Sequence, residues 1–261
     1  MLGAIIGDIV GSIYEFDNLR YKTFPLLTNR NYFTDDTIMT IAIYSALKKC
    51  KSHYDKLSDY AILEMQKFGK LYPNSQKISY GTRFASWLKC LNPQPYNSFG
   101  NGSAMRVSAV PYFANSIDEV KILSRMVTEV THNHPEGIKG AEAVASCIYL
   151  AKNNSSKEDI KDYVETNYYS LDFDYNELNK NYSFDETCQN TVPQAIYCFL
   201  ISTDFEDAIR TAVSIGGDTD TLCAIVGGIA EAYYGIPNNI KNEIFKYLDK
   251  RLSKIVKEFI K

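Results

Sequence analysis

Two acidic clusters near opposite ends of the chain carry the residue types best suited to metal chemistry. One is Thr34-Asp35-Asp36-Thr37 and the other is Gly216-Gly217-Asp218-Thr219-Asp220-Thr221, and each opens an apolar, helix-like run. Carboxylates gathered in one low-dielectric site repel each other, and they stay ionised there only if cations are present. Oxygen ligands suit hard cations such as Mg²⁺, Mn²⁺ or Ca²⁺. The two clusters are therefore candidates for a single metal centre that the fold assembles from both ends.

Both clusters also fit a purely structural role. Thr34 is a good helix N-cap, and acidic residues in a first helical turn complement the helix dipole. Gly216 and Gly217 could likewise end a preceding helix. However, the run from Leu222 to Ala230 is almost wholly apolar, which is typical of a buried helix. Carboxylates at the start of that helix would point into the interior or into a cleft, where they need a partner because burying an unpaired charge is costly.

The N-terminal segment adds a further acid beyond a glycine repeat. Gly3, Gly7 and Gly11 recur every four residues, and Glu15 follows them. Glycines at this spacing leave one face of a helix without side chains, so that another helix can approach closely. Glu15 could be a solvent-facing acid at a helix end or an acidic contributor beside the metal, and the residues alone leave both interpretations open.

A glycine-rich turn, Ser98-Phe99-Gly100-Asn101-Gly102-Ser103, leads into a predicted helix. Exposed backbone N–H groups at such a point can bind phosphate oxygens. No Gly-Lys-Ser/Thr follows, so the turn is not a Walker A loop, and it lacks the strand and the third glycine of a dinucleotide-binding fingerprint. Taken alone, the motif also fits a simple loop.

Two of the three histidines lie in the segment Thr131-His132-Asn133-His134-Pro135. A His-x-His pair before a helix fits a metal site, a ligand contact or a helix cap. No cysteine or third histidine lies nearby, which argues against zinc. A polar contact to a ligand and a structural role are both open on the residues alone.

The composition is that of an ordinary globular protein, with 261 residues, 45% of them apolar, and a net charge of −3. This charge offers no basic surface for nucleic-acid backbones, so stable nucleic-acid binding is not expected. No run has the form of a signal peptide or the length of a membrane span. The six cysteines form no CxxC pair and are expected to be reduced and mostly buried. We therefore expect a cytoplasmic protein without membrane partners, and a monomer.

Helical periodicity dominates the chain and predicts an all-α fold of about ten helices in a single domain over residues 1–261. The predicted helices span 35–50, 57–70, 103–114, 117–131, 136–152, 156–166, 191–202, 204–214, 219–234 and 237–259. Alternating strand patterns are rare, and no βαβ rhythm appears. Two polar, aromatic stretches, 72–102 and 167–190, interrupt the helices, and loops of this length are often functional.

Taken together, five segments resemble those of the ADP-ribosylglycohydrolase family. This family includes the dinitrogenase reductase-activating glycohydrolase and the hydrolases of ADP-ribosylarginine and ADP-ribosylserine. In family order, the segments are Gly7-Asp8 with Glu15, residues 34–37, residues 100–106, residues 131–135 and residues 216–221. Each is a weak signal alone, but all five in order over nearly the whole chain are highly specific. The resemblance implies a compact, orthogonal multi-helix bundle that hydrolyses the glycosidic bond between ADP-ribose and a modified target.

The resemblance also implies a binuclear Mg²⁺ centre, with Mn²⁺ as the alternative ion. By similarity, the metal ligands would be Thr34, Asp35, Asp36, Asp218, Asp220 and Thr221, with Glu15 beside the metals. The pyrophosphate would be held by Ser98, Gly100, Asn101, Gly102 and Ser103, while Phe99 would lie beneath the adenine. His134 would contact the diphosphate or the distal ribose. Asp36 and Glu15 are the candidate bases for the attacking water.

One departure from the family pattern leaves the target open. Some members carry a further catalytic aspartate between the first acidic cluster and the glycine-rich turn, but residues 78–84 of this chain contain no acid. The target that carries ADP-ribose could be a protein side chain such as arginine or serine, a nucleic acid or a small molecule. The alternatives are a catalytically inactive ADP-ribose-binding or structural protein on the same scaffold, and a Ca²⁺-stabilised helical interaction domain. No EF-hand loop supports the last of these.

Overall fold

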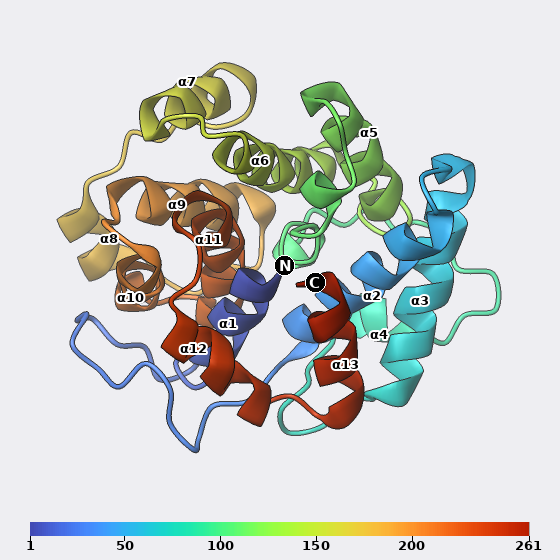
Figure 1. Ribbon diagram of the computed structural model, residues 1–261, viewed down its shortest axis with the longest axis horizontal. Helices are drawn as coiled ribbons and strands as arrows, with labels where there is room; N and C mark the ends of the chain where they lie inside the picture. Colours follow the sequence, from blue (N-terminus) through green and yellow to red (C-terminus); the bar gives the residue numbers. More distant parts are fainter. Residues whose placement is uncertain (261) are drawn as a thin grey trace.

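The computed structural model describes residues 1–260 and consists of α-helices joined by loops and short 3₁₀ turns (Figure 1). The helices are α1 (Leu2–Gly11), α2 (Asp35–Cys50), α3 (Leu57–Leu71), α4 (Thr82–Trp87), α5 (Ile117–Thr128), α6 (Pro135–Lys152), α7 (Lys157–Asn167), α8 (Tyr175–Asn181), α9 (Cys188–Ile201), α10 (Phe205–Ile215), α11 (Thr219–Tyr234), α12 (Asn238–Glu243) and α13 (Lys250–Phe259). Within these residues no strand forms, and one isolated bridge joins Gly100 to Thr187. The all-α prediction is confirmed, while the single-domain boundary stays a prediction.

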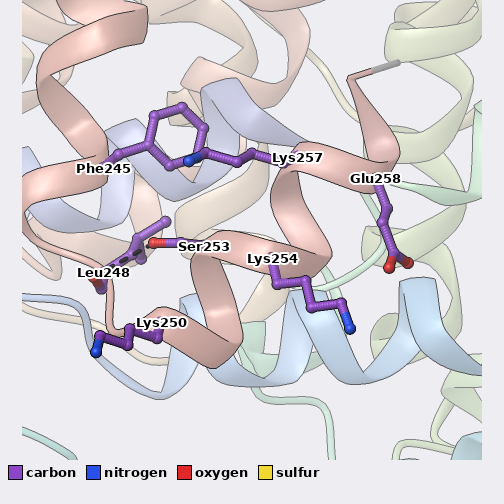
Figure 2. A pocket seen from close by; sticks show the side chains of 7 residues that line it. All are labelled: Phe245, Leu248, Lys250, Ser253, Lys254, Lys257 and Glu258. Carbon is purple, nitrogen blue, oxygen red and sulfur yellow. Dashed lines mark hydrogen bonds between the residues drawn. The ribbon is translucent and has the colours of Figure 1, made fainter.

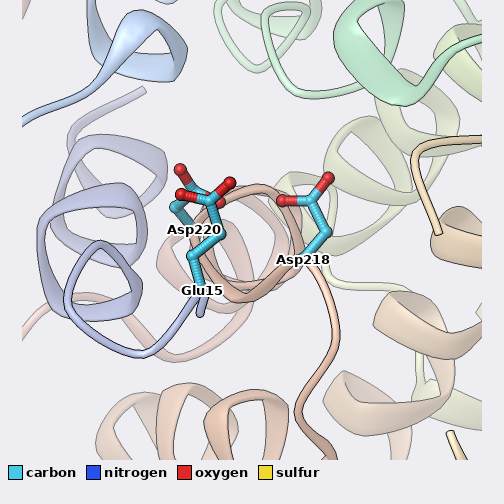
Figure 3. Close-up of side chains that lie close together, drawn as sticks. All are labelled: Glu15, Asp218 and Asp220. Atoms are coloured by element: carbon cyan, nitrogen blue, oxygen red, sulfur yellow. The ribbon is translucent and has the colours of Figure 1, made fainter. Parts of the chain in front are cut away.

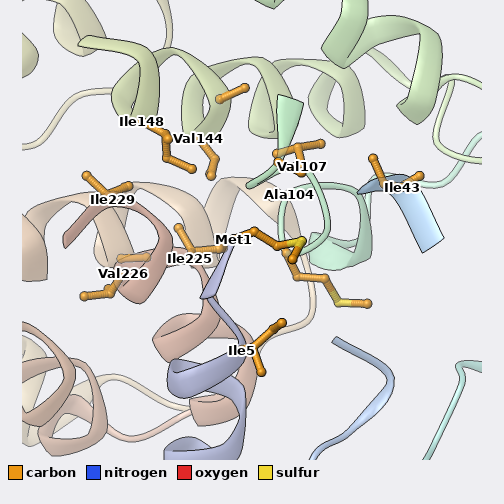
Figure 4. Packing of buried hydrophobic residues seen from close by; sticks show 14 of the residues in the cluster. Met1, Ile5, Ile43, Ala104, Val107, Val144, Ile148, Ile225, Val226 and Ile229 are labelled. Atoms are coloured by element: carbon orange, nitrogen blue, oxygen red, sulfur yellow. The ribbon is translucent and has the colours of Figure 1, made fainter. Parts of the chain in front are cut away.

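Helix α11 lies at the centre of the bundle, where it contacts α1, α6, α9 and α10. Every residue from Thr219 to Ala230 is buried, as the apolar sequence predicts. Figure 4 shows Met1, the N-cap of α1, with Ile225 of α11 and Val144 of α6 in one packed cluster of buried side chains. Because the whole first part of α11 is enclosed, its N-terminal carboxylates are fixed inside the molecule.

The glycines of α1 allow this helix to lie directly against α11. A Cβ atom on Gly7 would lie 1.8 Å from the carbonyl oxygen of Cys223, and one on Gly3 would lie 2.1 Å from that of Gly227. At Gly11 the nearest atom would be the carbonyl oxygen of Thr219, at 2.3 Å. The predicted close approach of a second helix is therefore confirmed. It places the end of α1 beside the start of α11.

Two predicted helices are wrong. Residues 103–114 contain only turns, with 3₁₀ segments at Asn101–Ser103 and Val110–Tyr112. Most apolar residues of this stretch are buried all the same, so their periodicity reflects burial and not a helix. Pro111 also lacks the N–H that a helix interior requires. Residues 237–259 form α12, a 3₁₀ turn and α13. The predicted helix is interrupted because Asp249 caps a new one, accepting hydrogen bonds from the backbone N–H groups of Arg251 and Leu252.

The two stretches predicted as loops each contain a short helix, α4 in residues 72–102 and α8 in residues 167–190.

The cysteines are all unpaired, with five buried and Cys90 exposed, as expected for reduced thiols. No helix within the described residues has the length and apolar character needed to cross a bilayer. The cytoplasmic location and the monomeric state stay predictions.

Candidate metal centre and substrate cavity

The acidic clusters from both ends of the chain meet in one cavity of about 320 Å³. Its acidic residues are Glu15, Asp35, Asp36, Glu186, Asp218 and Asp220. Its other lining residues are Ser79, Gly81, Thr82, Arg83, Phe84, Tyr96, Ser98, Gly100, Asn101, Gly102, Met105, Arg106, His132 and Thr221. The cavity thus combines the acidic clusters with most of the glycine-rich turn. It also contains two cationic side chains, Arg83 and Arg106, and the imidazole of His132.

Three carboxylates converge most closely within this cavity. Glu15, Asp218 and Asp220 each offer an oxygen atom, and these three atoms lie within 4.8 Å of one another (Figure 3). Glu15 belongs to the loop after α1, whereas the two aspartates lie at the N-terminal end of α11. An all-oxygen set of this kind suits a hard divalent cation.

The loop before α11 is held against the loop after α1 by one asparagine. Gly216 and Gly217 have φ angles of 70° and 83°, which favour glycine because a side chain would be strained there. The N–H of Gly217 donates to Asn18 Oδ1 at 2.8 Å, while Asn18 Nδ2 donates to the carbonyl oxygens of Tyr14 at 2.7 Å and Glu15 at 3.0 Å. Asn18 therefore fixes the backbone of Glu15 relative to the turn that carries Asp218.

Asp8 performs the same task for the first acidic cluster. This fully buried carboxylate accepts hydrogen bonds from the N–H of Thr34 at 3.0 Å, from Thr34 Oγ1 at 2.7 Å and from the N–H of Thr37 at 3.1 Å. It therefore caps the N-terminus of α2 from a neighbouring helix. Asp8 has no predicted role, although an acid inside a glycine-rich apolar segment is the signal that could identify it.

Asp36 carries a buried oxygen that the protein leaves unsatisfied. Its Oδ2 accepts a hydrogen bond from Thr221 Oγ1 at 3.4 Å, but its Oδ1 has no partner among the described residues. Thr34 caps α2 by accepting from the N–H of Asp36, and Thr34 does not line the cavity. A buried, unpartnered carboxylate oxygen beside other acids is the arrangement that a cation would complete.

Burial raises the pKa of several of these acids, and repulsion between neighbouring carboxylates raises it further for all of them except Asp8. Burial, followed by repulsion from Asp220, Asp8 and Glu186, raises the pKa of Glu15 to about 8. Burial also raises the pKa of Asp8 to about 6 and that of Asp218 to about 6. The pKa values of Asp35, Asp36 and Asp220 are raised well above the usual range, first by burial and then chiefly by neighbouring carboxylates. Without a cation, the site therefore holds protons that the unfolded chain would release.

These shifts predict a pH-dependent stability that divalent ions should remove. Between about pH 4 and pH 8 the metal-free folded protein binds more protons than the unfolded chain, because the pKa of Glu15 is raised to about 8. The free energy of unfolding should therefore fall as the pH rises through this window. Saturating Mg²⁺ should abolish most of the fall, since it pairs with the ionised carboxylates. Urea unfolding at pH 5, 6, 7 and 8, with EDTA or with Mg²⁺, measures both effects.

The control for this prediction is Glu15→Gln, which cannot ionise and should show a smaller fall between pH 6 and pH 8 in EDTA. Parallel curves with and without Mg²⁺ would contradict the metal centre.

The glycine-rich turn is fixed by the segment before α9. The N–H of Asn101 donates to the carbonyl oxygen of Glu186 at 2.7 Å, and the N–H of Cys188 donates to that of Phe99 at 2.9 Å. Asn101 Nδ2 donates to Asp218 Oδ2 at 2.7 Å, so this side chain links the turn to the acidic centre. Ser103 is fully buried and donates to the carbonyl oxygen of Gly137 at 2.8 Å, outside the cavity lining.

The two histidines of the His-x-His segment occupy different places. His132 is buried and lines the cavity, whereas His134 caps α6 by accepting a hydrogen bond from the N–H of Glu136 at 3.1 Å. Phe99 is 43% exposed and packs against His134, with ring centroids 5.1 Å apart, and neither residue lines the cavity. The family resemblance assigns the ligand contact to His134, because the spacing alone cannot tell the two imidazoles apart.

Arg106 is the least expected residue of the cavity. It is 1% exposed, lines the cavity and has no carboxylate partner among the described residues. Burial lowers its pKa to about 10, so the guanidinium stays charged at neutral pH. An unpaired buried cation in a cavity with a glycine-rich turn favours an anionic ligand.

A second cavity, of about 550 Å³, lies against α13 and the preceding turn (Figure 2). It is lined by Phe245, Leu248, Lys250, Ser253, Lys254, Lys257 and Glu258. Three lysines and one carboxylate cannot hold a divalent cation, and the carboxylate of Glu258 pairs with Lys48 at 2.5 Å. This second cavity is therefore not a candidate metal centre.

Comparison with known proteins shows the family. The sequence model of the ADP-ribosylglycohydrolases matches residues 1–260. The chain belongs to the ADP-ribosylglycohydrolase family. The "ADP-ribosylhydrolase ARH3" of Homo sapiens is 28% identical, covering 90% of this chain and 84% of that protein. The "ADP-ribosylarginine hydrolase Tri1" of Pseudomonas putida (strain GB-1) is 26% identical, covering 90% of this chain and 70% of that protein.

The fold of this family member also has a counterpart among solved structures. A chain of an "ADP-ribosylglycohydrolase-related protein complex" superposes with a TM-score of 0.67 at 21% identity, covering 97% of this chain and 93% of that one. The predicted helical bundle of this family is therefore confirmed.

Proposed function

We propose that this chain is a metal-dependent hydrolase that cleaves the glycosidic bond between ADP-ribose and a modified target. The observation that carries the proposal is the convergence of Glu15, Asp218 and Asp220 within 4.8 Å, in a cavity that also contains the glycine-rich turn. The family and the hydrolase names of its relatives support the reaction class. A single domain over residues 1–261 is part of the proposal.

The residues present fit two Mg²⁺ ions, with Mn²⁺ as an alternative. Thr34, Asp35, Asp36, Asp218, Asp220 and Thr221 would hold them, with Glu15 beside them. The unpartnered Asp36 Oδ1 and the raised pKa of every carboxylate in the group support this assignment. When bound, such ions supply Lewis-acid polarisation of sugar hydroxyls and of water.

The protein's own carboxylates would carry the proton transfer. Cleavage at the anomeric carbon develops oxocarbenium character, which neighbouring carboxylates stabilise. Asp36 and Glu15 both line the cavity and are the candidate bases for the attacking water. Residues 78–84 contribute Ser79 and Thr82 to the lining but no acid, so this segment supplies no base.

The glycine-rich turn would orient the substrate through its pyrophosphate. Ser98, Gly100 and Gly102 line the cavity, and Arg106 and His132 add positive and hydrogen-bonding groups behind the turn. Asn101 and Ser103, also assigned to the substrate from the sequence, make hydrogen bonds that hold the turn in place. Binding at the pyrophosphate, remote from the reacting carbon, would supply orientation to the reaction.

Phe99→Ala should weaken ADP-ribose binding about tenfold, because an aromatic ring stacked on a base contributes roughly 1–3 kcal/mol. The free energy of unfolding should change little, since the ring is 43% exposed. Calorimetric titration and urea unfolding test the two parts. Tyr21→Ala removes another exposed ring, one that lies outside the glycine-rich turn, and should leave the affinity unchanged. Unchanged affinity in Phe99→Ala would contradict the adenine contact.

The experiment that tests the function is a panel of ADP-ribosylated arginine peptide, serine peptide and nucleic-acid substrates, with and without chelator. Release of ADP-ribose from at least one substrate, lost in EDTA and restored by Mg²⁺, is the expected result. ADP-ribose binding without turnover on any substrate would instead favour an inactive ADP-ribose-binding protein. Mg²⁺-dependent or Ca²⁺-dependent melting without nucleotide affinity would indicate a metal-stabilised helical domain.

A further inference from the structure

Behind the glycine-rich turn, three buried polar side chains form a connected row. Arg106, Thr131 and His132 are 1%, 0% and 5% exposed. Arg106 Nη2 donates to Thr131 Oγ1 at 2.7 Å, and the same hydroxyl lies 2.7 Å from His132 Nδ1. The row therefore connects a buried cation to the only imidazole of the described residues that lines the cavity.

The distances indicate where the hydroxyl proton of Thr131 lies. Its two possible acceptors are His132 Nδ1 at 2.7 Å and the carbonyl oxygen of Thr128 at 3.3 Å. Hydroxyl donors make hydrogen bonds near 2.7–2.8 Å, whereas N–H donors are usually near 2.9–3.0 Å. The Thr128 oxygen also already accepts the N–H groups of Thr131 at 3.1 Å and His132 at 2.9 Å. The shorter distance and the two N–H groups already on the Thr128 oxygen favour donation of the hydroxyl proton to Nδ1, and in that arrangement Nδ1 is an acceptor.

An imidazole that accepts at Nδ1 carries its proton on Nε2 when it is neutral. The Nε2 atom of His132 faces the glycine-rich turn, since Cβ atoms built on Gly100 and Gly102 would lie 3.7 Å and 3.6 Å from it. In the opposite tautomer, with the proton on Nδ1, Nε2 would direct its lone pair towards an anion bound at the glycine-rich turn. Burial, with the positive charges of Arg106 and Arg83, lowers the pKa of His132 well below its usual value, so the ring is neutral.

We propose that Arg106 and Thr131 are positioning residues that hold His132 as a neutral imidazole with its proton on Nε2, which donates to the substrate pyrophosphate at the glycine-rich turn. The inference rests on the proposed function in one respect, namely that the ligand is ADP-ribose. The guanidinium donates to Thr131 Oγ1 and thereby occupies a lone pair of the hydroxyl, so that its proton turns towards His132. Both residues act through the imidazole and need not touch the substrate.

The test is the tautomer of His132, measured by ¹⁵N NMR of protein labelled at its three histidines. The signal that disappears in His132→Asn identifies the residue. In the wild-type protein we expect Nδ1 unprotonated and Nε2 protonated, with the Nε2–H signal shifting when ADP-ribose is added. Thr131→Val keeps the shape but removes the hydroxyl, so it should give a mixture of tautomers and weaken ADP-ribose binding about tenfold. Thr131→Ser should restore both the Nε2-protonated tautomer and the affinity for ADP-ribose.

A role of Thr131 in packing alone would leave the tautomer unchanged in Thr131→Val, and that result would overturn the inference. A wild-type proton on Nδ1 would overturn it as well, and this measurement does not require any variant to fold. If the wild-type protein binds no ADP-ribose, the proposed function and the pyrophosphate contact both fail. Normal ADP-ribose binding with the wrong tautomer would overturn the positioning roles alone.

Discussion

Asp218→Asn should lower turnover of an ADP-ribosylated substrate about a thousandfold while the helical circular dichroism stays unchanged. The carboxylate lies within 4.8 Å of oxygens from Glu15 and Asp220 and accepts a hydrogen bond from Asn101 Nδ2. The amide keeps the size of the side chain but not the charge that the cations require. Asp220→Asn should have an effect of similar size. Initial rates at saturating Mg²⁺ measure the loss.

In the metal-free protein, Asp218→Asn should not be harmful and should keep or raise the stability. Burial raises the pKa of Asp218 to about 6, so its ionisation opposes folding at neutral pH. Asp218→Asn should therefore unfold at equal or higher urea concentration in EDTA, and Mg²⁺ should stabilise it much less than the wild type. The matched control is Asp204→Asn at the N-cap of α10, where Asn is also a good cap. Wild-type turnover in Asp218→Asn would remove this residue from the site.

Gly7→Ala should lower the free energy of unfolding by about 3 kcal/mol, near the upper end for overpacking. The new methyl group would lie 1.8 Å from the backbone carbonyl oxygen of Cys223, and backbone cannot rotate aside as a flexible side chain can. Because Asp8 follows directly and binds Thr34, the displacement should also disturb the first acidic cluster. Urea unfolding and turnover of the same preparation test both effects.

Gly81→Ala is the matched control, since nothing lies within 4 Å of a Cβ atom built at that position. Its stability should stay within about 0.5 kcal/mol of the wild type. Equal stability of the two variants would show that α1 and α11 can separate without cost, which contradicts the close packing of these helices.

The sequence allowed the helices nearest the site to be predicted well. The predicted ranges 35–50 and 219–234 agree with α2 and α11. Both helices begin within an acidic cluster, and the apolar run predicted for α11 is buried in the structure. The sequence also predicted that the two acidic clusters meet, because buried carboxylates need a partner. Asp36, Asp218 and Asp220 indeed line the same cavity. Their roles as metal ligands stay predictions.

The parts that sequence could not give depend on contacts between distant segments. The apolar spacing over residues 103–114 reflects burial and not a helix. Just before this stretch, the backbone of Asn101 pairs with that of Glu186, a contact between distant segments that no local pattern predicts. Likewise, His132 and His134 are equivalent as a His-x-His pair until the start of α6 uses one of them as its cap. The sequence gives no sign that Arg106 is buried, because its burial follows only from the tertiary fold.

The contact between α1 and α11 has a consequence for the order of events during synthesis. The ribosome releases α1 first, yet the glycine face of this helix has no partner until α11 has emerged. Closing so long a stretch of chain costs entropy that only the finished contact repays. Hydrolytic competence should therefore arise late and abruptly, once translation has passed α11, and a nascent chain stalled at Gly217 would lack Asp218 and Asp220.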